Sequence, residues 1–276
     1  MPFVLANDIR IYYEIRGQGP RLLYIGGTAS DLRRLPNVFD SPLPGYFEVL
    51  AYDQRGMGQT DKPDIPYTMV DYASDAATLL EAVGWKSSCR VMGVSFGGMV
   101  AQELALRYPD RVERLVLCCT SSGGAGGASY PLHEHSHLSP LERARRLVEL
   151  TDTRRDAKWQ AAHRDLFQEW VDEVAASFAA ASSDSGLATG AWRQLEARKR
   201  HDTWDRLPDL KMPVYLCGGR YDGIAPESNL RAMERQIPNA RLELFNGGHQ
   251  FLLQDPRAYH ELITFLKGPG ESRVSL

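Results

Sequence analysis

Hydrophobic and polar positions along the chain form two alternating patterns. Short apolar runs that end in glycine or turn-forming residues are typical of strands buried in a sheet. Segments in which apolar residues recur every three or four positions predict amphipathic helices. The predicted strands are Phe3–Ala6, Ile9–Ile15, Leu22–Ile25, Phe47–Tyr52, Arg90–Val94, Val112–Cys119, Val214–Cys217 and Leu242–Phe245. The predicted helices between and after these strands are Val70–Val83, Phe96–Tyr108, Glu227–Gln236 and Arg257–Leu266.

The order of these elements predicts the fold class. The first two strands flank Asn7-Asp8, a pair that favours a tight hairpin turn. After them, strands alternate with helices, which is typical of a parallel sheet covered by helices on both faces. The prediction is therefore an α/β protein with a mostly parallel central sheet flanked by helices.

A helical segment interrupts the alternation after the sixth strand. The glycine-rich run SSGGAGGAS follows Thr120, and the next residues read as helices that include Leu141–Leu150 and Trp159–Phe178. More than 90 residues separate Cys119 from Val214, whereas a crossover helix needs only about a dozen. The predicted division is an α/β core of residues 1–122 and 206–268, an inserted helical cap of 123–205, and a flexible tail of 269–276.

Composition excludes several classes of protein. The 32 basic and 35 acidic residues leave a net charge of −3 without a basic stripe, so we expect no nucleic-acid partner. No apolar run of about 18 residues predicts a membrane span, and the N-terminus does not resemble a secretory signal. The four cysteines lack metal-ligand spacing, which favours reduced thiols and a cytoplasmic protein. The sequence leaves the oligomeric state open.

Residues Gly93-Val94-Ser95-Phe96-Gly97 match the pattern G-x-S-x-G. An apolar strand precedes the motif and a helix follows it, which predicts that Ser95 lies on a tight strand-to-helix turn. Such a turn presents the hydroxyl at the carboxyl edge of the sheet, where sites in open α/β folds lie. The start of the helix also adds partial positive charge near a developing oxyanion. We therefore expect Ser95 to be a nucleophile.

Two segments resemble the α/β-hydrolase superfamily. The run GVSFGGMVAQELALRYPDRVERLVL is similar to the superfamily's nucleophile segment, and YDQRGMGQTDKP is similar to its D-x-R-G-x-G-x-S/T segment. The resemblance extends from Asp8 to about Leu266 and is weakest in the inserted helices, which correspond to the variable cap. It implies the α/β-hydrolase fold and a serine hydrolase mechanism without a cofactor or a bound metal.

The resemblance also implies the partners of the nucleophile. The superfamily order is serine, then acid, then histidine, and this chain has Asp222 and His249 just after predicted strands. His249 is expected to be the general base and Asp222 the acid that orients it. Asp205 and Asp209 are alternative acids, but they precede the strand at Val214.

The oxyanion hole of such an enzyme requires two backbone N–H donors. One is expected from Phe96, directly after the nucleophile. The other is expected from Thr28 in Gly26-Gly27-Thr28, where many relatives carry His-Gly. Because that departure changes the alignment, the Gly27 N–H is the alternative donor.

Other polar groups are interpreted as structural. His133, His135 and His137 alternate with other residues, but the segment reads as a loop without matching carboxylates, so we expect no metal site. Asp53 and Arg55 are expected to brace loops at the edge of the sheet. The large aromatic residues of the cap, among them Trp159, Trp170 and Trp192, are expected either to form its core or to face a substrate.

The expected function is hydrolysis of a small carboxylic ester or lactone through an acyl-enzyme, with Ser95, Asp222 and His249 as the catalytic triad. Members similar to 3-oxoadipate enol-lactonases and small carboxylesterases fit best. The alternatives are a carbon–carbon bond hydrolase, although such enzymes commonly have Asn where this chain has Val94, a cofactor-free perhydrolase, and a weakly catalytic small-molecule sensor. The expected partner is a small molecule.

Overall fold

The computed structural model describes residues 2–268 and contains one eight-stranded sheet. The strands follow the order β1-β2-β4-β3-β5-β6-β7-β8 across the sheet. The β1–β2 and β2–β4 pairs are antiparallel, and all the other pairs are parallel. This arrangement confirms the predicted mostly parallel sheet. The strands are β1 Phe3–Ala6, β2 Ile9–Arg16, β3 Arg21–Ile25, β4 Glu48–Tyr52, β5 Cys89–Val94, β6 Val112–Cys118, β7 Val214–Gly219 and β8 Ala240–Phe245.

Helices cover both faces of the sheet, as expected for parallel strands whose two sides are apolar. Side chains of α1, α2 and α7, such as Tyr72, Met99 and Leu230, pack in one core on one face. Phe251 and Leu262 of α8 and α9 belong to the core on the other face. The helices are α1 Met69–Ala82, α2 Phe96–Arg107, α3 Pro140–Thr151, α4 Ala157–Ala162, α5 Arg164–Ser183, α6 Ser185–Lys199, α7 Glu227–Gln236, α8 Phe251–Gln254 and α9 Arg257–Lys267.

The hairpin between β1 and β2 forms where the sequence predicts it. Asn7 and Asp8 have φ angles of 48° and 62°, in the left-handed region that a two-residue type I′ turn requires at both positions. Asn and Asp tolerate this region better than other non-glycine residues. The turn pairs Ala6 with Ile9, and both of these side chains are buried in the core.

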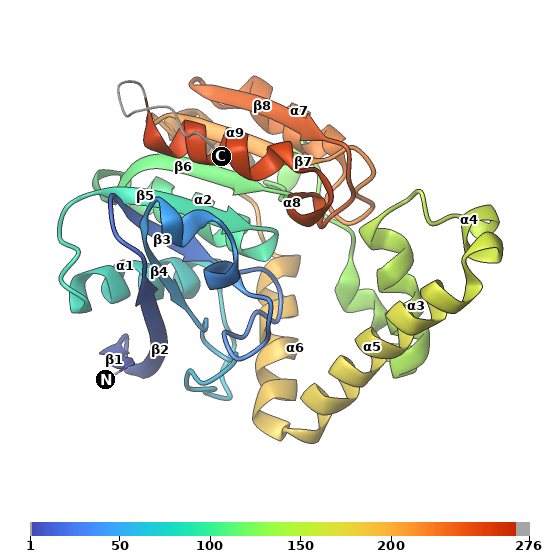
Figure 1. Cartoon of the computed structure of the whole chain (residues 1–276). Helices are drawn as coiled ribbons and strands as arrows, with labels where there is room; N and C mark the ends of the chain where they lie inside the picture. Colours follow the sequence, from blue (N-terminus) through green and yellow to red (C-terminus); the bar gives the residue numbers. More distant parts are fainter. Residues whose placement is uncertain (1, 269–276) are drawn as a thin grey trace.

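Helices α3 to α6 lie between β6 and β7 in the sequence and form a separate group at one side of the sheet (Figure 1). Helices α3 and α5 bury Ala144, Val148, Phe167 and Val171 against each other. This helical group is consistent with the predicted cap, whose boundaries at residues 123 and 205 stay a prediction. The predicted tail, residues 269–276, lies outside the described residues.

One predicted helix of this group is wrong in its continuity. The sequence predicts a single helix over Trp159–Phe178, but the structure divides the segment into α4 and α5 at His163. His163 has φ −128° and ψ 41°, outside the helical region, and its ring stacks on Trp159 at 4.4 Å between centroids. The packing of these rings overrides the local helical periodicity.

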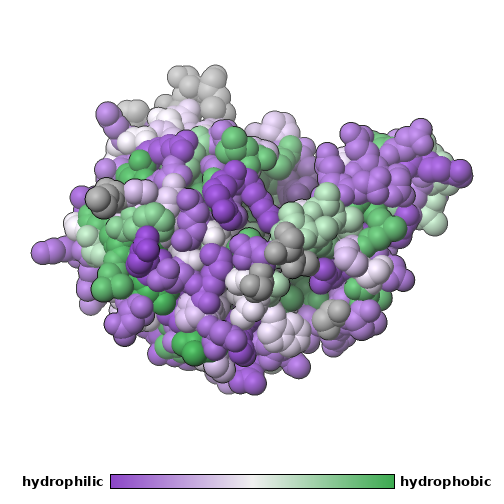
Figure 2. All heavy atoms as spheres, turned by 90° about the horizontal axis from the view of Figure 1, so that it is seen from below, coloured by the Kyte–Doolittle hydropathy of each residue, from purple (hydrophilic) through white to green (hydrophobic). Residues whose placement is uncertain are grey.

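The surface and the cysteines agree with the composition. Hydrophilic residues predominate on the face drawn in Figure 2, and hydrophobic residues form separate patches there. All four cysteines are buried free thiols, and their reduced state in the cell stays a prediction. Among residues 2–268, no helix combines the length and the apolar character that crossing a bilayer requires.

Candidate active site

Ser95 lies on the turn that joins β5 to α2. Its φ of 55° and ψ of −115° are unusual for a residue with a side chain, and such conformations persist only where neighbouring groups hold them. The Ser95 N–H donates to the carbonyl of Cys118 at 2.8 Å. The Ser95 carbonyl accepts from Thr120 Oγ1 at 2.8 Å. Both contacts come from β6 and the loop after it, so the neighbouring strand holds the turn in place.

The glycines of the G-x-S-x-G motif are required by close packing around this turn. A Cβ at Gly97 would lie 2.1 Å from the carbonyl oxygen of Ile25, and a Cβ at Gly93 would lie 2.3 Å from the carbonyl oxygen of Gly97. Both distances are far shorter than a carbon–oxygen contact allows. The absence of side chains therefore lets α2 start directly against the ends of β3 and β5, with Ser95 at the carboxyl edge of the sheet.

The structure brings the three residues of the predicted triad together from three separate loops. His249 Nε2 lies 3.0 Å from Ser95 Oγ, and His249 Nδ1 lies 2.7 Å from Asp222 Oδ2. Asp222 follows β7 and His249 follows β8, the next strand in the sheet. The carboxyl ends of parallel strands meet at one edge, which is why residues so far apart in sequence can meet.

The Asp222 carboxylate is buried, and its two oxygens have different hydrogen-bond partners. Its Oδ1 accepts from the backbone N–H groups of Ile224 and Ala225 at 2.8 and 2.9 Å, while Oδ2 faces His249. Two backbone N–H groups and the His249 ring thus surround the carboxylate and hold its orientation. Because a carboxylate oxygen accepts hydrogen bonds, the contact with Asp222 Oδ2 assigns the ring hydrogen of His249 to Nδ1 and leaves Nε2 as an acceptor for the Ser95 hydroxyl.

The end of α3 contacts both of the loops that carry Asp222 and His249. The Thr151 carbonyl accepts from the His249 N–H at 2.6 Å, and the Leu150 carbonyl accepts from the Gly223 N–H at 2.9 Å. These carbonyls belong to the last turn of a helix, which has no intrahelical donors for them. Sequence reasoning missed this contact, since nothing in the local sequence of α3 indicates which loops it will meet.

The alternative acids do not join this group. Asp205 and Asp209 lie in the 3-10 helix Trp204–Asp209, where both side chains are exposed. Neither has a hydrogen bond to His249 among the described residues. Asp222 is therefore the acid that the fold places beside this histidine.

The predicted oxyanion donors lie on two sides of Ser95. Phe96 is the first residue of α2, so its N–H has no intrahelical acceptor. Gly27 and Thr28 lie on the loop after β3 and line the same cavity as Ser95. A Cβ built on Gly27 would lie 3.6 Å from the Ser95 Cβ, so this loop approaches Ser95 closely. The choice between Thr28 and Gly27 as the second donor stays a prediction.

Asp53 and Arg55 brace loops, as the sequence suggests. Asp53 is buried, and its carboxylate accepts from the N–H groups of Leu32 and Gln59 at 2.8 Å each. Burial raises the pKa of Asp53 to about 6. Arg55 forms a buried ion pair with Asp75 at 2.6 Å. Asp53 thereby holds the loop that continues from Gly27 and Thr28 against the segment after β4.

Ser95 and His249 open into a cavity of about 920 Å³ between the sheet edge and the inserted helices. Most of the side chains from α3, α5 and α6 that line it are apolar, and Trp192 is one of them. Trp170 is not among the lining residues and stacks instead on Trp159 at 5.7 Å between ring centroids. The further apolar residues from these helices are Leu147, Phe178, Ala181, Ala188, Ala191 and Leu195.

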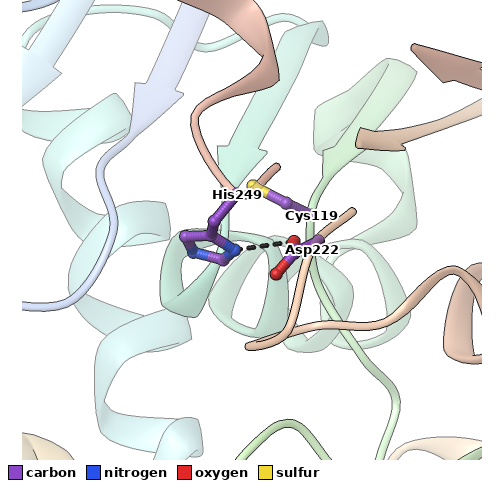
Figure 3. Close-up of side chains that lie close together, drawn as sticks. All are labelled: Cys119, Asp222 and His249. Atoms are coloured by element: carbon purple, nitrogen blue, oxygen red, sulfur yellow. Dashed lines mark hydrogen bonds and ion pairs between the residues drawn. The ribbon is translucent and has the colours of Figure 1, made fainter. Parts of the chain in front are cut away.

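Cys119 is a neighbour of the predicted triad that sequence reasoning did not single out. Its Sγ lies within 4.8 Å of potential ligand atoms of both Asp222 and His249 (Figure 3). Burial raises the pKa of this thiol well above its usual value, so it stays neutral beside the carboxylate.

The predicted loop with His133, His135 and His137 contains a short 3-10 helix, Leu132–His137, in which His135 contacts the Tyr130 hydroxyl at 3.1 Å.

Comparison with known proteins identifies the family. The alpha/beta hydrolase fold family matches residues 25–256. A poly(3-hydroxyalkanoate) depolymerase of Ectopseudomonas oleovorans is 30% identical over 242 residues, which cover 88% of this chain and 82% of the relative. A 3-oxoadipate enol-lactonase of Acinetobacter baylyi is 22% identical and covers 94% of this chain and 93% of its own. The crystal structure of the enol-lactonase from Burkholderia xenovorans superposes with a TM-score of 0.76 at 22% identity, over 96% of this chain and 99% of that one. The chain therefore belongs to the alpha/beta hydrolase fold family.

Proposed function

We propose that this protein hydrolyses a small carboxylic ester or lactone through an acyl-enzyme, with Ser95 as nucleophile, His249 as general base and Asp222 as the orienting acid. The observation that supports this proposal is the continuous chain of contacts from Ser95 Oγ through both ring nitrogens of His249 to Asp222 Oδ2. A nucleophile, a base within hydrogen-bond reach and a third group that orients the base are the parts that acyl transfer requires.

In the first half of this reaction, the Ser95 oxygen attacks the carbonyl carbon of the substrate while its proton moves to His249 Nε2. The carbonyl oxygen gains negative charge, which the N–H groups of Phe96 and of Thr28 or Gly27 stabilise. As the tetrahedral intermediate collapses, the bond to the leaving oxygen breaks and His249 returns the proton to that alkoxide. The product is an acyl ester on Ser95 and a free alcohol, or a hydroxyacyl ester where the substrate is a lactone.

In the second half, water attacks the acyl carbon and His249 takes a proton from the water. The second intermediate collapses, Ser95 recovers its proton from His249, and the carboxylic acid leaves. The imidazolium that forms in each half lies 2.7 Å from the buried Asp222 carboxylate, which stabilises its positive charge.

The cavity supports a substrate with an apolar acyl or alcohol part. A pocket of about 920 Å³ lies in the usual range for small-molecule sites. Its walls from α5 and α6 are mostly apolar, and the guanidinium of Arg143 adds a polar group: its buried Nε has no partner among the described residues. The Arg143 Cζ stacks 4.5 Å from the ring centroid of Phe178. Such a site can hold an apolar chain and still recognise one polar substituent.

The name of one relative suggests carbon–carbon bond hydrolysis as a second candidate reaction. A 2-hydroxymuconate semialdehyde hydrolase of Pseudomonas putida is 29% identical over 233 residues, and carbon–carbon bond hydrolysis and perhydrolysis both suit the same triad. Carbon–carbon hydrolases commonly have Asn before the nucleophile, where this chain has Val94. We therefore favour ester or lactone hydrolysis, and a direct comparison of p-nitrophenyl esters with a vinylogous 1,5-diketone substrate distinguishes the two.

The proposal is tested by Ser95→Ala, with Ser88→Ala as a control at an exposed serine before β5. Ser95→Ala should abolish labelling by a fluorophosphonate probe and lower kcat for p-nitrophenyl butyrate by about 10⁶-fold. Ser88→Ala should leave both unchanged. Undiminished labelling of the Ser95→Ala variant would contradict the assignment of the nucleophile. A single slow acylation of the unmodified protein, without further turnovers, would instead support a small-molecule sensor.

A further inference from the structure

A hydrogen bond joins the inserted helices to the loop that carries the predicted second oxyanion donor. The Ala29 N–H donates to Oε1 of Gln194 at 2.8 Å. Gln194 lies in α6 and is fully buried, whereas Ala29 directly follows Thr28 in the loop after β3. Because an N–H group can only donate, the contact assigns the oxygen of the Gln194 amide, rather than its nitrogen, to this position. A residue of the inserted helices therefore contacts the backbone beside the predicted donors.

The backbone of Ala29 has a conformation that requires support from its neighbours. Its φ is 58°, in the left-handed region that residues with a side chain rarely adopt. Such conformations persist where surrounding contacts hold them, and they cluster at functional sites. Without an acceptor opposite its N–H, Ala29 could relax toward an ordinary φ. The peptide group between Thr28 and Ala29 would then turn.

The two preceding peptide groups are held by the core. The Gly26 carbonyl accepts from Gln54 Nε2 at 2.9 Å, and the Gly27 carbonyl accepts from the Ser30 N–H at 3.2 Å. A trans peptide group points its N–H opposite to its carbonyl. These two bonds therefore set the directions of the N–H groups of Gly27 and Thr28, which are the candidate donors of the oxyanion hole.

The next peptide group, between Thr28 and Ala29, is held by Gln194 instead. Only φ and ψ of Thr28 separate this group from the one that carries the Thr28 N–H. Fixing both peptide groups fixes those two angles. If the bond to Gln194 is lost, the backbone can rotate at Thr28, and the direction of its N–H is less well defined.

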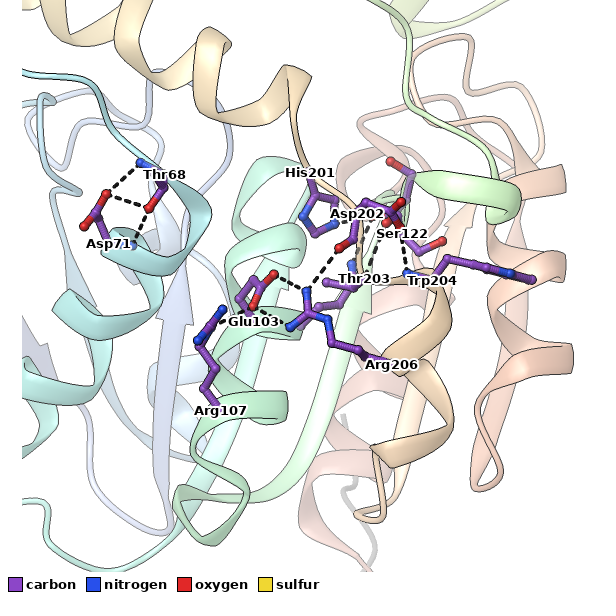
Figure 4. A network of polar contacts seen from close by, with 12 residues as sticks. Thr68, Asp71, Glu103, Arg107, Ser122, His201, Asp202, Thr203, Trp204 and Arg206 are labelled. Atoms are coloured by element: carbon purple, nitrogen blue, oxygen red, sulfur yellow. Dashed lines mark hydrogen bonds and ion pairs between the residues drawn. The ribbon is translucent and has the colours of Figure 1, made fainter.

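Helix α6 is packed tightly on the core, so the position of Gln194 is fixed. A Cβ at Gly190 would lie 1.9 Å from the Gly56 carbonyl oxygen, which shows that the backbone of α6 lies directly against the segment after β4. Gly190 and Gln194 are four residues apart and share one face of the helix. The segment that leaves α6 is anchored too, because Arg206 forms an ion pair with Glu103 of α2 (Figure 4).

Gln194 does not line the catalytic cavity, although residues beside it do. Ala191 and Leu195 of the same helix are among the lining residues, and so are Thr28 and Ala29. Gln194 is therefore placed to act on the reaction through the loop rather than by touching a substrate.

We propose that Gln194 is a positioning residue for the oxyanion hole, an inference that rests on the serine hydrolase mechanism proposed above. Its amide oxygen holds the Ala29 N–H and thereby keeps the donor N–H of Thr28 or Gly27 directed at the oxygen that gains charge. Such donors stabilise the transition state far more than the bound ester, because the negative charge develops only during the reaction. Loss of this acceptor should therefore lower kcat and leave KM nearly unchanged.

The test replaces Gln194 by Met, whose thioether is only a weak acceptor. For p-nitrophenyl butyrate, kcat should fall about 10- to 100-fold, which is less than the loss of about 10²–10³ when an oxyanion donor is removed outright. KM should stay within about twofold. A trifluoromethyl ketone with a butyl chain, which forms a tetrahedral adduct with a serine nucleophile, should bind about 10- to 100-fold more weakly. The matching methyl ketone, which resembles the bound substrate, should keep its affinity.

Thr203→Val is the matched control, because it removes a different buried hydrogen bond between the inserted segment and the core. Thr203 follows α6, and its Oγ1 donates to Gln102 Oε1 at 2.6 Å. Both variants should lower the melting temperature by about 2–8 °C, but Thr203→Val should keep kcat within about threefold. If Gln194→Met does not fold, Gln194→Asn carries the comparison, since its side chain is one methylene shorter and its oxygen falls short of the Ala29 N–H.

Three results would overturn the proposal. The first is a kcat of Gln194→Met within about threefold of the unmodified enzyme. The second is an equal loss of kcat in Thr203→Val, which would indicate general loosening of the inserted helices. The third is a parallel loss of affinity for both ketones, which would indicate a role in binding the substrate.

Failure of the proposed function gives a different result from failure of this inference. In that case the unmodified protein would lack ester turnover although a fluorophosphonate still labels Ser95. The labelling rate then decides the role of Gln194, because phosphonylation also develops charge on an oxygen beside the nucleophile. Labelling of Gln194→Met that is about 10- to 100-fold slower would support the inference, and an unchanged rate would overturn it. A Ser95 that is not labelled in the unmodified protein would overturn both proposals.

Discussion

Replacing Asp222 by Asn tests the proposed mechanism while leaving shape and volume almost unchanged. The carboxamide can be placed in two ways. Its oxygen can accept from the N–H groups of Ile224 and Ala225, as Asp222 Oδ1 does, and the NH₂ group then faces His249. In the opposite placement, the NH₂ group faces two backbone donors and leaves both buried N–H groups unpaired, at about 1–3 kcal/mol each. The first placement is therefore favoured by about 2 kcal/mol or more, which is roughly thirtyfold.

The favoured placement turns the histidine into the wrong tautomer. An NH₂ donor opposite Nδ1 requires Nδ1 to accept, so the hydrogen moves to Nε2, the nitrogen that lies 3.0 Å from Ser95 Oγ. An Nε2–H cannot take the proton of the Ser95 hydroxyl. The equivalent change in the triad of a serine protease lowers kcat by about 10⁴, which is about 5.5 kcal/mol of activation free energy. We expect a loss of this size for Asp222→Asn.

The assay is kcat for p-nitrophenyl butyrate at pH 7, with the melting temperature measured alongside to show that the fold persists. Asp205→Asn and Asp209→Asn serve as matched controls, because both are exposed aspartates in the 3-10 helix before β7, and both should keep near-normal activity. The reasoning is refuted if Asp222→Asn stays within tenfold of the unmodified enzyme while its melting temperature is unchanged. Severe loss in either control would identify a different acid.

Three further outcomes are expected. Gly97→Ala should destabilise the protein by about 3 kcal/mol or more in urea unfolding, because its Cβ would lie 2.1 Å from a carbonyl oxygen of β3, whereas Gly45→Ala has open space and should be close to neutral. Trp192→Ala should shift kcat/KM toward longer acyl chains because Trp192 lines the cavity. Trp170→Ala should mainly lower the melting temperature. Equal effects of the two variants on chain-length preference would contradict these different roles. The pKa of His201, lowered to about 4 by burial, means that the unfolded chain binds its proton first as the pH falls below about 6.5. The stability that a neutral His201 contributes is therefore present above about pH 6.5 and lost toward pH 4. Between pH 7 and 4.5, the free energy of unfolding of the unmodified protein should fall by about 2–3 kcal/mol more than that of the His201→Gln variant. Equal decreases in the two proteins, measured by urea titration, would contradict the effect.

The order of strands and helices could be predicted from the sequence because its signals are local. The turn at Asn7 and Asp8 depends on the backbone preferences of those two residues, and the alternation of the later elements depends on the spacing of apolar side chains within each segment. The strand-to-helix turn at Ser95 could be predicted for the same reason, since its two flanking glycines and the adjacent strand and helix lie within a few residues. The helix ends were predicted within a few residues, apart from the break at His163, where ring packing decides.

The distances within the candidate site were decided only by the tertiary structure. The sequence orders Ser95, Asp222 and His249, but their contacts at 3.0 and 2.7 Å arise because β5, β7 and β8 end at one edge of a sheet. The contact of Thr151 with the His249 loop had no sequence signal either. Such contacts join segments far apart in the chain.

The different surroundings of Trp192 and Trp170, and the burial of Arg198, were also decided by the tertiary structure. Both tryptophans lie in helices of the inserted segment, yet one lines the cavity and the other packs on Trp159. An arginine at a polar helix end is expected to be a solvated charge, but the fold buries Arg198, and no acid within residues 2–268 forms an ion pair with it. The composition of a segment sets which groups are available, whereas burial and pairing depend on the neighbours that the fold brings to each group, and those neighbours are distant in sequence.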